Sequence, residues 1–165
     1  MSMIKKTKLS EGKESVWGYP RPPRLEKFNK EIKIIFNDEV IVRTNNAYRV
    51  LETSHPPVYY IPPEDIKMEF LSPGNGASSC EWKGKANYYN VKVKGKEAVK
   101  AGWYYPVPTN EFAEIKGYVA FYAGKLDSCS VDGEQVIPQP GGFYGGWITK
   151  DIVGPFKGEP GTFGW

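Results

Sequence analysis

The sequence predicts a mainly β domain, built from compact antiparallel sheets with one short helix. Tyr89, Val91 and Val93 alternate with polar residues, which is the period of a strand with one buried face. The Asp132-Gly133 pair is typical of a tight hairpin turn. Aromatic residues, which favour strands, make up 15% of the 165 residues, and this length suits one domain with a sizeable core.

Residues 32–137 are expected to form the β domain itself, as short strands joined by turn residues. Residues 72–79 are rich in Pro, Gly, Asn and Ser and are expected to form a loop. The expected strands are residues 31–36, 40–43, 47–52, 58–61, 66–71, 89–94 and 97–105.

The short helix is expected near residues 109–116. Thr109 can cap its start, Glu111 lies in its first turn, and Gly117 follows its last turn.

Two tails flank the β domain, residues 1–31 and residues 138–165, and the second holds eight Gly and four Pro. Both tails also contain Trp, Tyr or Phe, and each large apolar side chain left in water costs about 1.5–3 kcal/mol. We therefore expect the N-terminal arm to pack on the body, and the C-terminal tail to pack on the body or on a second subunit. A homodimer is thus one alternative.

The charge pattern excludes some partners. Residues 1–31 hold eight Lys and Arg against four Glu, and the rest of the chain is near neutral. Phosphate binding needs basic residues gathered on one face, so we interpret the arm as a solvated tail and expect no nucleic acid. No apolar run approaches the roughly 20 residues of a membrane span, and no apolar leader is present, so the expectation is a cytoplasmic protein without a membrane partner.

The two cysteines, Cys80 and Cys129, are too few for a disulfide framework or a four-cysteine zinc site. No P-loop, dinucleotide-binding glycine motif or serine nucleophile elbow occurs, and one histidine cannot supply a multi-histidine metal site. The sequence therefore predicts no cofactor and no metal.

The only histidine, His55, stands in a segment whose prolines stiffen the backbone around it. Together with Glu52 and Cys80 it forms the candidate catalytic set, because a histidine can activate a thiol and a carboxylate can orient the ring. The alternative is that none of the three is catalytic. Cys80 would then be a buried thiol, the His55 ring would be hydrogen-bonded to a local carbonyl, and Glu52 would form a salt bridge. Lys83 could join this set. A regular strand would place Cys80 and Lys83 on opposite faces, so bringing Glu52, His55, Cys80 and Lys83 together requires a bulge or bend in that strand.

Five further residues are candidates for ligand binding. Lys83 or Arg49 would bind the charge of an anionic ligand, and Tyr59, Tyr60 and Trp103 would provide aromatic surfaces. Each has a structural alternative. Lys83 would be a surface lysine at a strand end, one of Tyr59 and Tyr60 would be buried and the other exposed, and Trp103 would belong to the core.

Four ordered segments, residues 49–63, 80–89, 101–106 and 119–122, resemble the domain of unknown function 427 family, and the flanks resemble a longer, cyanobacterial-like version of it. The resemblance implies a β-tent or Mss4-like arrangement, with two sheets meeting at an angle around a cleft. Many relatives of that arrangement bind zinc on Cys-x-x-Cys knuckles, which this chain lacks, so no structural zinc is expected.

The family is sometimes labelled a nucleotidyltransferase family. The chain has no paired carboxylates for Mg²⁺, and Lys125-Leu126-Asp127 is followed by Ser128 where adenylation requires Gly, so that activity is the weaker alternative. The main expectation is a cleft for a small polar or anionic ligand, with catalysis left open. The remaining alternative is a non-catalytic interaction or oligomerisation module.

Overall fold

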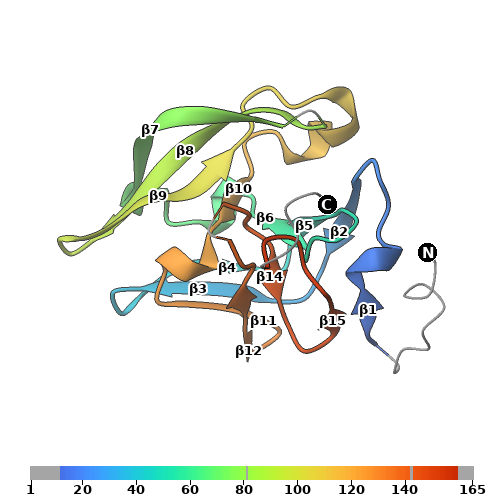
Figure 1. The fold of residues 1–165 in the computed structure, drawn as a ribbon. Helices are drawn as coiled ribbons and strands as arrows, with labels where there is room; N and C mark the ends of the chain where they lie inside the picture. Colours follow the sequence, from blue (N-terminus) through green and yellow to red (C-terminus); the bar gives the residue numbers. More distant parts are fainter. Residues whose placement is uncertain (1–11, 81, 142, 160–165) are drawn as a thin grey trace.

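The computed structural model describes residues 12–80, 82–141 and 143–159, and it is mainly β, as the sequence predicts (Figure 1). Three sheets of three or four strands are antiparallel throughout. The first, in the order β10-β9-β8-β7, contains β7 (Leu71–Cys80), β8 (Gly84–Val93), β9 (Lys96–Tyr104) and β10 (Val119–Phe121). The second, in the order β12-β11-β3-β4, contains β3 (Ile32–Phe36), β4 (Glu39–Thr44), β11 (Ser128–Val131) and β12 (Glu134–Gln135). The third, in the order β2-β5-β6, contains β2 (Arg24–Phe28), β5 (Ala47–Leu51) and β6 (Val58–Tyr60).

The main core lies between the first two sheets, which Figure 1 shows one above the other. Ile34 and Phe36 of β3 pack in one cluster with Val91 and Val93 of β8. These four side chains are at most 2% exposed. The alternation seen in the sequence of β8 is thus the pattern of a strand with one face on this core.

A second, smaller apolar cluster lies between the first and third sheets and supports the candidate site. It contains Tyr60 from β6, Trp103 from β9, and Phe112 and Ile115 from the segment that follows β9. The two sheets are joined by main-chain hydrogen bonds between Ile61 and Val119, at 2.9 Å in each direction. This bridge fixes the end of β6 against β10.

The expected loop at residues 72–79 is wrong, because this segment belongs to strand β7. Pairing with β8 supplies the main-chain hydrogen bonds that the local sequence does not favour, and the register shifts between Pro73 and Ala77. Gly76 takes a φ of +81°, which a glycine adopts at little cost. Tertiary pairing here overrides the preference of Pro, Gly and Asn for loops.

Two other expectations need correction. The strand expected at residues 66–71 is wrong for most of its length, because Met68–Phe70 forms the 3-10 helix η3. The short helix is present as η4 (Asn110–Ile115), but it is a 3-10 segment interrupted at Phe112. Thr109 does not cap it; its hydroxyl instead donates a hydrogen bond to the carbonyl of Trp82 at 2.6 Å.

Three further 3-10 turns complete the helical segments of the described residues: η1 (Val16–Gly18), η2 (Pro63–Asp65) and η5 (Ala123–Lys125).

The described parts of the two tails contact the body and each other. β1 (Glu14–Ser15) pairs in parallel with β15 (Ile152–Val153), and β13 (Ile137–Pro138) pairs with β14 (Trp147–Ile148). The indole of Trp147 is 1% exposed in the main core and donates a hydrogen bond to the carbonyl of Phe121 at 3.0 Å. The C-terminal tail therefore supplies part of the core.

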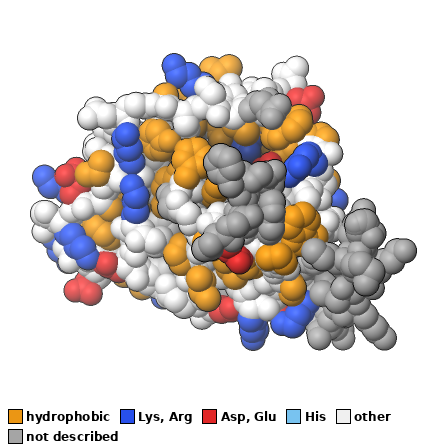
Figure 2. All heavy atoms as spheres, in the orientation of Figure 1, with side chains coloured by type: hydrophobic (Ala, Val, Ile, Leu, Met, Phe, Trp, Pro, Cys, Tyr) orange, Lys and Arg blue, Asp and Glu red, His pale blue; other side chains and the backbone are white. Residues whose placement is uncertain are grey.

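On the face shown in Figure 2, Lys and Arg side chains are scattered among acidic and apolar ones. Among the described residues, no helix has the length and apolar character that crossing a membrane requires.

Candidate functional site

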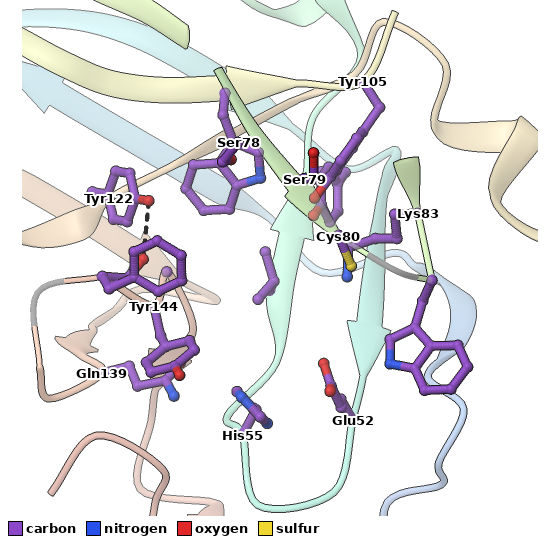
Figure 3. A pocket seen from close by; sticks show the side chains of 16 residues that line it. Glu52, His55, Ser78, Ser79, Cys80, Lys83, Tyr105, Tyr122, Gln139 and Tyr144 are labelled. Carbon is purple, nitrogen blue, oxygen red and sulfur yellow. Dashed lines mark hydrogen bonds between the residues drawn. The ribbon is translucent and has the colours of Figure 1, made fainter. Parts of the chain in front are cut away.

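A cavity of about 280 Å³ lies where the first sheet, the turn between β5 and β6, and the C-terminal tail meet (Figure 3). Glu52 and His55 line it from that turn, and Cys80 lines it from the end of β7. Trp103 of β9 and Tyr144 of the tail also line it. Figure 3 shows Glu52 and His55 on the side of the cavity opposite Cys80.

The structure brings six of the eight predicted site residues to this cavity: Glu52, His55, Tyr60, Cys80, Lys83 and Trp103. Cys80 is the last residue of β7, while Trp82 and Lys83 lie in the turn before β8. Lys83 is therefore not bound by strand alternation and can line the same cavity as Cys80.

The other two residues, Arg49 and Tyr59, line a second cavity of about 630 Å³. They are paired in the register of β5 and β6, and Tyr59 points away from the face that carries Val58 and Tyr60. Arg49 there forms ion pairs with Glu14 at 3.0 Å and Glu26 at 2.6 Å. These contacts occupy its guanidinium, and its pKa is raised because the two carboxylates outweigh the opposing effect of burial.

His55 is held by a local turn. Its main-chain NH donates to the carbonyl of Glu52 at 3.0 Å, and its Nδ1 lies 2.9 Å from the carbonyl oxygen of Thr53. A carbonyl oxygen only accepts hydrogen bonds, so the contact requires the proton on Nδ1 and leaves the Nε2 lone pair free in the neutral ring. Burial lowers the pKa of His55 below its ordinary value, against an opposing effect of the Glu52 charge. The ring therefore offers a hydrogen-bond acceptor at neutral pH, with Tyr144 edge-on at 5.3 Å.

Lys83 is 8% exposed, which is unusual for a lysine. Its Nζ lies 5.7 Å from the centre of the Phe112 ring, and among the described residues no carboxylate forms an ion pair with it. Its main-chain carbonyl accepts a hydrogen bond from the NH of Thr109 at 3.0 Å, which fixes the turn. The charge acts on the cavity wall, because it lowers the pKa of His55 and opposes the effect of burial on the pKa of Tyr105.

The two cysteines differ in access. Cys80 is a half-buried free thiol at the cavity, whereas Cys129 is fully buried in the main core. Burial raises the pKa of the Cys129 thiol to about 12, so it stays protonated and unreactive.

Sequence reasoning missed much of the wall. Trp82 and Tyr105 lie within the segments 80–89 and 101–106 that the sequence analysis singled out, so their aromatic rings were a usable signal. The tail residues Gln139 and Tyr144 lie far from those motifs in sequence, and only the fold brings them to the cavity. Gln139 accepts from the NH of Gly146 at 3.0 Å and donates to the carbonyl of Lys157 at 2.9 Å, which positions the tail. The remaining wall residues not predicted are Ser78, Ser79, Tyr122, Phe143 and Gly145, with Val58.

Among the described residues, no group of three or more His, Cys, Asp and Glu side chains is placed to hold a metal ion.

Comparison with known proteins assigns the chain to a family. No curated protein matches the chain. Residues 24–132 match the family described as a domain of unknown function, DUF427. This range contains Glu52, His55, Cys80, Lys83 and Trp103, whereas the tail wall of the cavity lies outside it. Since the match covers well over half of the sequence, the chain belongs to the DUF427 family.

Proposed function

We propose that the cavity binds a small ligand that carries an anionic group on a planar or aromatic body. The observation that carries this proposal is Lys83, a residue that is 8% exposed as a whole, lines the cavity and has no ion-pair partner among the described residues. A charge that is partly withdrawn from water and has no partner is costly, and a bound anion would offset that cost.

The walls favour a planar body. Tyr60, Trp103 and Tyr105 line the cavity and belong to one apolar cluster, with Tyr60 and Trp103 in edge-to-face contact and their ring centres 6.4 Å apart. Trp103 also contacts Tyr122, with ring centres 4.6 Å apart. Aromatic rings that pack against one another offer a fixed apolar surface, and ligand cavities typically combine such a surface with a few polar groups. The free Nε2 acceptor of His55 would receive a hydrogen bond from the ligand.

The proposal can be tested by following tryptophan fluorescence during titration with 4-methylbenzoate and with its neutral counterpart 4-methylbenzamide. We expect 4-methylbenzoate to bind about tenfold or more tightly than the amide, since a charge-assisted hydrogen bond contributes roughly 1.5–3 kcal/mol. Lys83→Met should remove that difference.

The matched control is Lys85→Met, because Lys85 is exposed, lies two residues away and is outside the cavity. Equal affinity for acid and amide in the wild type, or unchanged preference in Lys83→Met, would contradict the proposal.

Catalysis is a second candidate, favoured by the presence of the Cys80 thiol and the His55 acceptor in one cavity. In that version Cys80 attacks the carbonyl carbon of a ligand bound between the two walls, the carbonyl π bond opens as the S–C bond forms, and the thiol proton is passed across the cavity to Nε2 of His55. The rate of Cys80 modification by iodoacetamide should then depend on His55 and fall in His55→Gln. Equal rates in the two proteins would remove this candidate and leave the binding proposal standing.

A further inference from the structure

The cavity contains two opposite charges that do not neutralise each other. Glu52 and Lys83 both line it, but no ion pair joins them, and among the described residues neither side chain has another ion-pair partner. The contrast within the same molecule is Arg49, whose side chain is 11% exposed and contacts two carboxylates. The fold thus pairs the largely buried cation Arg49 with two carboxylates, whereas Glu52 and Lys83 have no ion-pair partner among the described residues.

Both charges act on the cavity wall at His55. Glu52 raises the pKa of His55 and Lys83 lowers it, so the His55 ring lies in the field of each. Figure 3 shows Glu52 and Lys83 approaching from different parts of the wall, Glu52 from the side of His55 and Lys83 from the side of Cys80. A ligand seated against His55 would therefore face a carboxylate and an ammonium at once.

Resting on the proposed function, we infer that the ligand is zwitterionic: its anionic group pairs with Lys83, and an ammonium-type cation on the same small aromatic body pairs with Glu52. Partly buried charges interact more strongly than fully exposed ones and are less screened by salt. A ligand that carries only the anion would leave Glu52 unpaired and close to the bound negative charge. A ligand that carries both an anionic group and an ammonium group would pair with Lys83 and Glu52 at the same time.

The test compares probes that differ by one ammonium group. L-phenylalanine is matched with 3-phenylpropionate, and 4-(aminomethyl)benzoate with 4-methylbenzoate, so that the two pairs cover adjacent and distant charges. Affinities are measured by calorimetry at low salt. In at least one pair the zwitterion should bind about tenfold or more tightly than its anionic counterpart.

Glu52→Gln should remove this advantage and leave the anionic probe bound at least as tightly as in the wild type, because the repulsion is gone. The retained anion binding also shows that the variant is folded. Glu69→Gln, an exposed change outside the cavity, is the control and should preserve the advantage.

The outcomes separate the two proposals. If anions bind through Lys83 and the ammonium group adds nothing in either pair, or if its advantage survives in Glu52→Gln, this inference is wrong and the proposed function stands. If no anionic probe binds in a way that depends on Lys83, the proposed function itself fails.

Discussion

The Nδ1 atom of His55 lies 2.9 Å from the main-chain carbonyl oxygen of Thr53, two residues earlier in the chain. This contact sets the ring tautomer and directs the free Nε2 acceptor away from the turn. Burial at this position lowers the pKa of His55, so the ring stays neutral at physiological pH. The state of the candidate site is therefore linked to the stability of the fold.

His55 should make stability depend on pH. Its folded-state pKa lies below the ordinary value of 6.5, so as the pH falls below about 6.5 the unfolded chain binds a proton that the folded protein resists. The stability that neutral His55 contributes above about pH 6.5 is therefore lost as the pH falls towards the lowered pKa of His55 in the folded protein. Urea unfolding between about pH 7 and pH 5 should show a steeper loss for the wild type than for His55→Gln. Parallel profiles for the two proteins would contradict this.

Ser54 should be a source of strain beside His55. It takes a φ of +70°, is 1% exposed, and its hydroxyl has no hydrogen-bond partner in the described part of the structure. Ser54→Gly relieves both costs and should raise the free energy of unfolding by roughly 0.5–1 kcal/mol. Ser54→Ala removes only the unpaired hydroxyl and should gain less. A glycine variant less stable than the wild type would count against this explanation.

Trp147 should anchor the C-terminal tail to the core. Trp147→Phe removes buried volume and leaves the carbonyl of Phe121 without its 3.0 Å donor, at a cost of about 2–3 kcal/mol. Urea denaturation measures this loss. Val107→Ala is the control, because Val107 is 80% exposed and its change should stay within about 0.5 kcal/mol. Similar losses for both variants would mean that the tail contributes little.

Gly145 should be required for the shape of the cavity. A Cβ at this position would overlap the Trp103 ring, so Gly145→Ala must displace either the ring or the tail. We expect a loss of roughly 1–3 kcal/mol and a change in tryptophan emission. At Gly18 a Cβ meets no atom within 4 Å, so Gly18→Ala serves as control. Unchanged emission and stability in Gly145→Ala would refute the close packing.

Arg49 should stabilise the fold without binding the ligand. Arg49→Met leaves Glu14 and Glu26, which are 36% and 33% exposed, without their shared partner and should cost about 1–2 kcal/mol once solvent screening is included. Its affinity for 4-methylbenzoate should equal that of the wild type, because Arg49 lines the other cavity. Arg24→Met, which changes a side chain that is 61% exposed, should have little effect on stability. Weakened 4-methylbenzoate binding in folded Arg49→Met would return Arg49 to the candidate site.

The sequence by itself determined the fold class and named six of the residues that line the candidate cavity. Alternation in β8 indicates a strand with one buried face, and together with the Asp132-Gly133 hairpin turn it favours antiparallel sheets around a core. The motifs around His55 and Cys80 also indicated which polar groups could meet, since they are local and rich in reactive side chains.

Only the tertiary structure decided which groups share a cavity. Arg49 and Tyr59 belong to the same motif as His55, yet strand register turns them to a different cavity, and register is set by pairing between distant segments. The turn after Cys80 releases Lys83 from strand alternation, so these two side chains line one cavity. The tail wall at Gln139 and Tyr144 comes from residues far away in sequence, because burial of Trp147 and the hydrogen bonds of Gln139 hold the tail there. Contacts between segments that are distant in sequence thus decide which residues line the same cavity, and no local sequence pattern reveals those contacts.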